Sequence, residues 1–166
     1  NPTIDSKLGI TTENATSGSF VSNLDSLLPN TTYYVRAYAT NSEGTAYGVE
    51  DTFVTPQIIS IPTISTASVS TITDSSAVSG GTIDTNGGAA ITASGVVWDT
   101  VSNPTIDSKL GITTENSTSG SFVSNMTGLS ASTTYYVRAY ASNSEGSAYG
   151  EEIIFNTSES ASYDIL

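Results

Sequence analysis

The chain has 166 residues, 16 of them acidic and 4 basic, and its formal net charge of −12 excludes electrostatic binding to nucleic acid or to an anionic membrane surface. It contains neither cysteine nor histidine, which excludes disulfide bonds, thiol nucleophiles, Ser-His-Asp triads and the ordinary zinc sites within it. No apolar run approaches the roughly 18 residues of a transmembrane helix, so direct membrane insertion is not expected.

The beginning of the chain is repeated later in the sequence. NPTIDSK at residues 1–7 recurs at residues 103–109, and the offset of 102 continues without a gap to residues 55 and 157. Of these 55 aligned pairs, 42 are identical. One period matches the common domain size of roughly 100 to 150 residues. We therefore expect residues 1–55 to be the C-terminal half of a repeat, completed either by further polypeptide or by a neighbouring subunit.

A short segment separates this half from a complete repeat. Residues 56–62 read PQIISIP, and their three isoleucines and two prolines predict a short, partly packed linker. The complete repeat is expected at residues 63–157. Residues 158–166 are expected to form a tail, the start of another linker, or a strand that pairs with another subunit.

The complete repeat has the pattern of an all-β domain. Short β-like runs alternate with turn residues at the spacing of a sandwich, and helical periodicity is absent. The chain contains 54 serine and threonine residues and 14 glycines, a composition that favours turns and strands over helix. The expected strands are residues 64–72, 77–83, 91–98, 110–114, 119–126, 133–142 and 148–156.

The most informative segment is residues 129–141, LSASTTYYVRAYA, which matches residues 27–39, LLPNTTYYVRAYA. Alternate residues of a strand point to opposite faces, so Tyr135, Val137 and Ala139 share one face. The alternating Leu, Pro, Thr, Tyr and Val, followed by a turn and a closing strand that ends in Phe-x-Thr, resembles the fibronectin type III repeat. The resemblance implies immunoglobulin-like β-sandwiches in tandem, with the first repeat incomplete.

This resemblance assigns structural roles to three aromatic residues. Tyr33 and Tyr135 would be corner tyrosines, whose hydroxyl ties a loop to the strand. Unlike the animal pattern, residues 77–83 carry no tryptophan, and the only tryptophan, Trp98, closes the third strand. VVW at residues 96–98, followed by NPT at residues 103–105, is similar to the variant repeated in tandem in exported and cell-surface bacterial proteins.

A stripe of aromatic and basic residues is expected on the other face of the same strand. It comprises Tyr34, Arg36 and Tyr38 in the first copy and Tyr136, Arg138 and Tyr140 in the second. Such a stripe could stack on sugar rings or bind a protein partner. The alternative, which we favour, is a cation–π and cross-strand ladder that covers the sheet's own outer face.

Acidic residues are the remaining candidates for chemistry. Two carboxylates for catalysis or oxygen ligands for calcium are conceivable, but no spacing follows a known calcium loop. We expect solvated loop residues and no cofactor, with calcium at a junction between repeats as the alternative. The residues considered are Asp84, Asp99, Asp107, Glu115, Glu145, Glu151 and Glu152.

Two classes of function remain, both extracellular, either at the cell surface or secreted. The first is a non-enzymatic spacer or stalk of a bacterial surface protein, adhesin or fibre, with adjacent repeats or neighbouring fibre subunits as its partners. The second is a glycan- or protein-binding adhesion module, or an accessory module of a secreted polysaccharide-degrading enzyme. The near identity of the two copies favours the spacer, because duplication adds length with little new surface.

Overall fold

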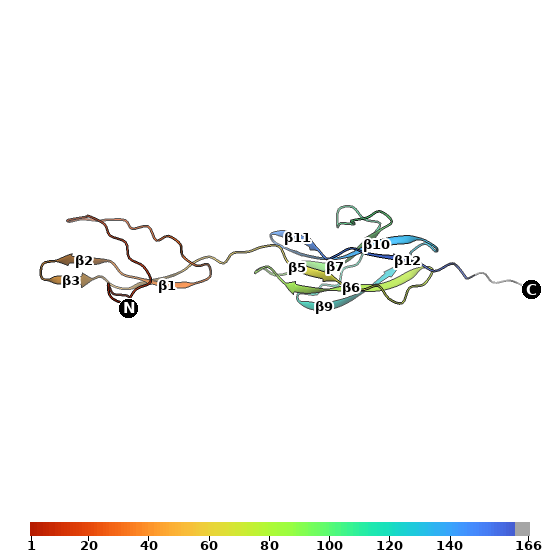
Figure 1. Ribbon diagram of the computed structural model, residues 1–166, viewed down its shortest axis with the longest axis horizontal. Coiled ribbons are helices and arrows are strands. Elements are labelled where there is room, and N and C mark those ends of the chain that lie inside the picture. The colour runs from red at the N-terminus through yellow and green to blue at the C-terminus, as the bar shows by residue number, and fades with distance from the viewer. Residues whose placement is uncertain (162–166) are drawn as a thin grey trace, which may run out of the picture. The chain divides into compact units, whose positions relative to one another are not determined.

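The computed structural model describes residues 1–161 of the chain (Figure 1). Within these residues, the regular secondary structure consists of β-strands and contains no helix. The chain divides into two units, Asn1–Ile58 and Ile59–Leu166. Residues 162–166 of the expected tail lie outside the described residues. The two units are described separately below.

The second unit is a sandwich of two antiparallel sheets (Figure 1). One sheet has the order β5 (Thr63–Thr66), β6 (Ser76–Thr85) and β9 (Gly120–Thr127). The other has the order β11 (Gly146–Tyr149), β10 (Thr134–Asn143), β7 (Ala93–Asp99) and β8 (Gly111–Ile112), and β12 (Ile153–Asn156) also pairs with β10. The expected all-β, immunoglobulin-like fold of the fibronectin type III kind is confirmed.

The core lies between these two sheets and follows the alternation of the strands. Tyr135, Val137 and Ala139 of β10 are buried in it, as the sequence pattern predicts. Burial of a valine or phenylalanine side chain stabilises a fold by roughly 1.5 to 3 kcal/mol, so this layer holds the sheets together without any disulfide. The other members are Ala77, Ile83, Val96, Trp98, Phe122, Met126, Leu129, Ala141 and Phe155.

The last expected strand is two strands, because it is interrupted at Gly150. The Ala139 carbonyl still accepts from the Gly150 N–H at 2.9 Å, but the Ala139 N–H donates to Thr66 Oγ1 at 3.0 Å. The Thr66 side chain thus accepts the hydrogen bond of the Ala139 N–H, which the backbone of a continuous strand would otherwise have accepted. A Cβ at Gly150 would lie 2.4 Å from Thr66 Oγ1, so glycine is required at this interruption.

The first expected strand is likewise shorter than residues 64–72. β5 ends at Thr66, where its side chain reaches the other sheet. The Ala67 N–H still donates to the Gly80 carbonyl of β6 at 3.0 Å, and the chain pairs with β6 again at an isolated bridge between Ser70 and Val78.

The first unit contains two short antiparallel ladders instead of two packed sheets. β1 (Thr32–Val35) pairs with β4 (Asp51–Val54), and β2 (Tyr38–Asn41) pairs with β3 (Gly44–Tyr47). Their registers repeat those of β10 with β12 and of β10 with β11 at the offset of 102. The first unit therefore reproduces one edge of the sandwich.

Within the second unit, the chain enters and leaves at opposite ends of β10. Near its start, the Ser60 carbonyl accepts from Asn143 Nδ2 at 2.7 Å, and Asn143 is the last residue of β10. Near its end, the Thr157 N–H donates to the Thr133 carbonyl at 3.0 Å, and Thr133 immediately precedes β10. Ser60 and the buried Pro62, both within the expected linker 56–62, thus pack on the second unit.

Candidate functional site

The corner before β10 is tied down by Tyr135. Its hydroxyl oxygen accepts a hydrogen bond from the Ser130 N–H at 2.9 Å, and its buried ring stacks on Phe155 with 5.7 Å between centroids. Tyr33 occupies the corresponding place in the first unit, where its hydroxyl accepts from the Leu28 N–H at 2.9 Å. In both units, one side chain therefore joins a loop to the strand that follows it.

Replacing Tyr135 by phenylalanine is expected to lower the free energy of unfolding of the second unit by about 1 kcal/mol, because the Ser130 N–H loses its acceptor while the ring packing is kept. Urea unfolding followed by the fluorescence of Trp98, the only tryptophan, measures the change. The control is Tyr136→Phe, on the opposite face of β10, which should change it by no more than about 0.3 kcal/mol. Equal losses in both variants would contradict a special role for the corner.

Trp98 is buried in the core at the end of β7, directly opposite Gly111 of β8. A Cβ at Gly111 would lie 2.2 Å from Cε2 of the indole, so the short strand β8 leaves its side-chain position to the tryptophan ring. Trp98 therefore packs in the core against the space that Gly111 leaves open.

The repeated motif NPTIDSK forms a strap, residues 103–109, over the outer face of β10 and β11. The Ile106 N–H donates to the Tyr149 hydroxyl at 3.0 Å, and the Asn103 N–H donates to the carboxylate of Glu152. Pro104, the second residue of the strap, is fully buried. The strap excludes water from a face of the sheet that a simple sandwich would leave exposed.

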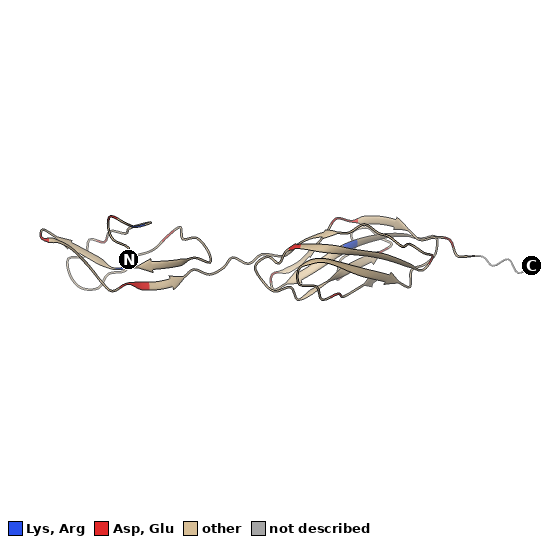
Figure 2. Cartoon of the chain, turned by 90° about the horizontal axis from the view of Figure 1, so that it is seen from below, with Lys and Arg blue, Asp and Glu red and all other residues tan. Residues whose placement is uncertain are grey.

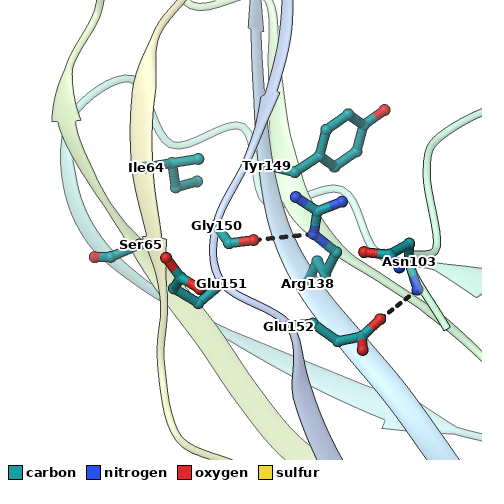
Figure 3. Close-up of a pocket in the computed structure, with 8 residues that line it drawn as sticks. All are labelled: Ile64, Ser65, Asn103, Arg138, Tyr149, Gly150, Glu151 and Glu152. Atoms are coloured by element: carbon teal, nitrogen blue, oxygen red, sulfur yellow. Dashed lines mark hydrogen bonds between the residues drawn. The ribbon is translucent and has the colours of Figure 1, made fainter.

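Arg138 lies under this strap and is held by two contacts (Figure 3). Its guanidinium carbon is 4.9 Å from the centroid of the Tyr149 ring, and its Nε donates to the Gly150 carbonyl at 2.9 Å. Val97, its direct partner on β7, is fully buried although it lies outside the core between the sheets. These contacts match the interpretation in which the stripe covers the sheet's own outer face.

Tyr140, expected to lie on the outward stripe, is only 2% exposed. Its hydroxyl donates to the Thr113 carbonyl at 2.8 Å, and Thr113 in turn donates its N–H to the Val96 carbonyl at 2.9 Å. The chain that follows β8 therefore runs along β7 and closes over the Tyr140 ring. Tyr136 is half-buried, so the three residues do not form a continuous exposed surface in the second unit.

The first unit repeats these contacts at the offset of 102. Arg36 lies 4.9 Å from the centroid of the Tyr47 ring and donates through Nε to the Gly48 carbonyl at 3.0 Å. Tyr38 donates its hydroxyl to the Thr11 carbonyl at 2.9 Å, whereas Tyr34 is exposed. The same strap contact is present, from the Ile4 N–H to the Tyr47 hydroxyl at 2.9 Å.

A groove of about 360 Å³ lies beside Arg138 in the second unit (Figure 3). Its lining comprises Ile64, Ser65, Asn103, Arg138, Tyr149, Gly150, Glu151 and Glu152. Figure 3 shows that Arg138 and Glu152 already spend hydrogen bonds on the backbone of Gly150 and Asn103. The groove thus offers few free polar groups to a ligand.

Acidic residues are distributed over both units (Figure 2). Within residues 1–161, no three histidine, cysteine, aspartate or glutamate side chains lie together in a group that could hold a metal ion. Calcium takes six to eight oxygen ligands, more than the two carboxylates of the groove provide. Calcium at a junction between repeats stays a hypothesis.

The strap is the feature that sequence reasoning missed, since residues 99–109 were given no role beyond connecting the expected strands at residues 91–98 and 110–114. One signal for it was available: NPTIDSK is identical in both copies, whereas residues 128 and 130–132 of the equally loop-like corner differ from residues 26 and 28–30. In the structure, the backbone N–H groups of Ile106 and Asn103 hold the strap in place.

No family model matches the chain, and no curated protein matches it. Among solved structures, the sensor domain of the anti-sigma factor RsgI4 of Pseudobacteroides cellulosolvens is 20% identical over 61% of this chain and 98% of that one, with a TM-score of 0.44. The FN1-FN3 domains of chicken CNTN1 are 17% identical over 84% of this chain and 45% of that one, with a TM-score of 0.43.

Among the described residues, no helix is long and apolar enough to cross a membrane.

Proposed function

We propose that the chain is a non-enzymatic spacer of an extracellular bacterial surface protein, adhesin or fibre, in which each repeat adds length. The observation that carries this proposal is the placement of the two ends of the second unit at opposite ends of β10. A repeat that is entered at one end and left at the other extends the polypeptide by about the length of its longest strand. For the ten residues of β10, this is roughly 30 Å.

Both ends are held firmly, as a spacer under tension requires. At the start, the Ser60 N–H donates to the Gly87 carbonyl at 2.8 Å, in addition to the bond from Asn143. At the end, the Ser158 N–H donates to the Thr73 carbonyl at 3.0 Å, and the Ser158 carbonyl accepts from the Ser132 N–H at 3.0 Å. A pull on the chain therefore acts directly on backbone hydrogen bonds of the sandwich.

The contacts of the aromatic and arginine side chains within the second unit also support a spacer. Tyr135, Arg138, Tyr140 and Tyr149 spend their polar groups or rings on contacts within the unit. A binding module would keep such groups available for its ligand. With no histidine or cysteine in the chain, the proposal also includes no catalysis.

Small-angle X-ray scattering of the chain extended by one and two further copies of residues 59–157 tests the spacer. We expect the maximum dimension to grow by at least about 30 Å with each copy, because each unit contributes the length of β10. The control replaces residues 56–62 and their counterparts by glycine and serine, which should reduce the increment by making the connections flexible. A dimension that stays constant while mass is added would contradict the proposal.

The binding alternative has one observation in its favour. Tyr136 lies directly opposite the exposed Ile154 on the edge of the sheet, a small apolar surface that a partner could cover. A glycan array compared between the natural chain and Tyr136→Ala tests it. Binding that is lost in the variant would favour an adhesion or accessory role over a spacer.

A further inference from the structure

The first unit exposes residues that the second unit buries. Phe20 is 46% exposed, whereas its counterpart Phe122 is 8% exposed, and Leu24 is 44% exposed, whereas its counterpart Met126 is 0% exposed. Residues 16–23 around Phe20 are identical to residues 118–125 around Phe122, so the difference in burial of this pair arises from what covers it. The first unit therefore carries an apolar face that is built to be covered.

In the second unit, the cover is the segment that contains β5, β6 and β7. β7 pairs with β10 from Tyr136↔Asp99 to Ser142↔Ala93, and β6 pairs with β9 from Ser76↔Thr127 to Ile83↔Gly120. In the first unit, β1 and β2 have strand neighbours on one edge only among residues 1–161. Their other edges present the backbone groups that β10 uses to hold β7.

The asparagine at the end of this strand edge, Asn143 in the second unit and Asn41 in the first, makes the same turn contact in both units. Asn143 Oδ1 accepts from the Glu145 N–H at 2.9 Å, while its Nδ2 donates to the Ser60 and Asn86 carbonyls at 2.7 and 2.9 Å. In the first unit, Asn41 Oδ1 accepts in the same way from the Glu43 N–H at 2.9 Å. Asn41 Nδ2 is the counterpart of the donor that binds these two carbonyls of the covering segment in the second unit.

We propose that the open face of the first unit binds a three-stranded segment of the same repeat type as residues 59–102 and thereby becomes a complete sandwich. The occupant supplies counterparts of β5, β6 and β7.

The occupant is not the corresponding segment of a second copy of this chain. In each copy, residues 59–102 are committed to their own unit, where Ala77 is 1% and Val96 is 0% exposed. Releasing them would open one sandwich for each one completed, with no net gain in buried surface. A second copy therefore gains no buried surface by filling this face, which favours an occupant that is not already part of a sandwich.

The test adds a peptide with the sequence of residues 59–102 to the full chain and measures amide hydrogen exchange. We expect exchange at Arg36 and Tyr38, whose counterparts Arg138 and Tyr140 pair with β7, to slow at least tenfold and to approach the rates of those counterparts. A second experiment uses a fusion protein in which the sequence of residues 59–102 is joined directly to Asn1. This fusion removes the dependence of the result on the solubility of the free peptide. Unchanged exchange in the joined chain would overturn the proposal.

A substitution at Ala37 provides the control. Ala139, its counterpart, is packed so closely that a Cβ on Gly81 would lie 2.6 Å from its methyl group, whereas Ala37 itself is exposed. Ala37→Leu should therefore leave the uncovered unit unchanged and prevent the slowing of exchange. Ser42→Leu adds the same side chain at an exposed turn position and should preserve it.

Analytical ultracentrifugation of the chain alone shows whether a second copy of the chain, the alternative occupant, covers the open face of the first unit. A monomer with rapid exchange in residues 31–41 supports the proposal. A dimer in which these residues are protected without any added segment would overturn it in favour of a second copy. Neither outcome depends on the scattering dimensions that test the spacer.

Discussion

Replacing Phe122 by alanine is expected to lower the free energy of unfolding of the second unit by about 4 kcal/mol. Phe122 lies on β9 with its ring in the core between the sheets, close to Gly81 of β6. Truncation of a buried phenylalanine removes its transfer free energy and leaves a cavity that the sheets only partly close, which together cost about 3 to 5 kcal/mol. Domains of this size are stable by only about 5 to 15 kcal/mol, so the loss is a large fraction of the total.

Urea unfolding monitored by Trp98 fluorescence measures this loss, because Trp98 belongs to the same core cluster as Phe122. The midpoint should fall while the dependence of the free energy on urea stays the same. The chain provides a matched control in Phe20→Ala, the same truncation at the counterpart in the first unit. Phe20 is partly solvated, so hydrogen exchange of β1 and β4 should report a change below about 1 kcal/mol. A loss as large as that of Phe122→Ala would mean that Phe20 is buried in solution.

Replacing Gly95 by alanine is expected to destabilise the second unit by about 3 kcal/mol. A Cβ at this position would lie 2.2 Å from the Thr113 carbonyl oxygen, so either β7 or the segment over it must move. Movement is costly because Thr113 is held from several sides. Its carbonyl accepts from the Tyr140 hydroxyl at 2.8 Å, and its Oγ1 accepts from the Val96 N–H at 3.0 Å. The added methyl group should thus break contacts well beyond its own volume.

The same fluorescence measurement quantifies the effect of Gly95→Ala. Gly9→Ala is the control, because a Cβ at Gly9 meets no atom within 4 Å. It should change stability by no more than about 0.5 kcal/mol. A neutral Gly95→Ala would show that the segment at Thr113 is not packed on β7 as described.

Much of the fold could be predicted because its signals are local. The alternation of Tyr135, Val137 and Ala139 identifies a strand with one buried face, and all three residues are buried. The 102-residue offset identifies the unit and predicts that Arg36 and Arg138 make equivalent contacts, as they do with Tyr47 and Tyr149. Such inferences need only neighbouring residues or a comparison of the chain with itself.

The outward stripe could not be placed in the same way. Alternation correctly puts Tyr140 on the face opposite to Val137, but it cannot show that Thr113 covers that face. The cover depends on β7 pairing with β10 on one side and with β8 on the other, which brings together residues far apart in the chain. The expected strand 148–156 is divided for the same kind of reason, since Thr66 of the other sheet binds the Ala139 N–H.

The sequence by itself therefore determined the class of fold, the repeat and the shared face of Tyr135, Val137 and Ala139, because alternation concerns neighbouring positions and the repeat is found by comparing the chain with itself. Only the tertiary structure decided that NPTIDSK is a strap, that Tyr140 is buried, and that Phe20 and Phe122 have different surroundings. The physical reason is that a side chain is buried only when a second part of the fold packs against the surface on which it lies. Two nearly identical half-repeats differ in solvation because one of them is covered by β5, β6 and β7.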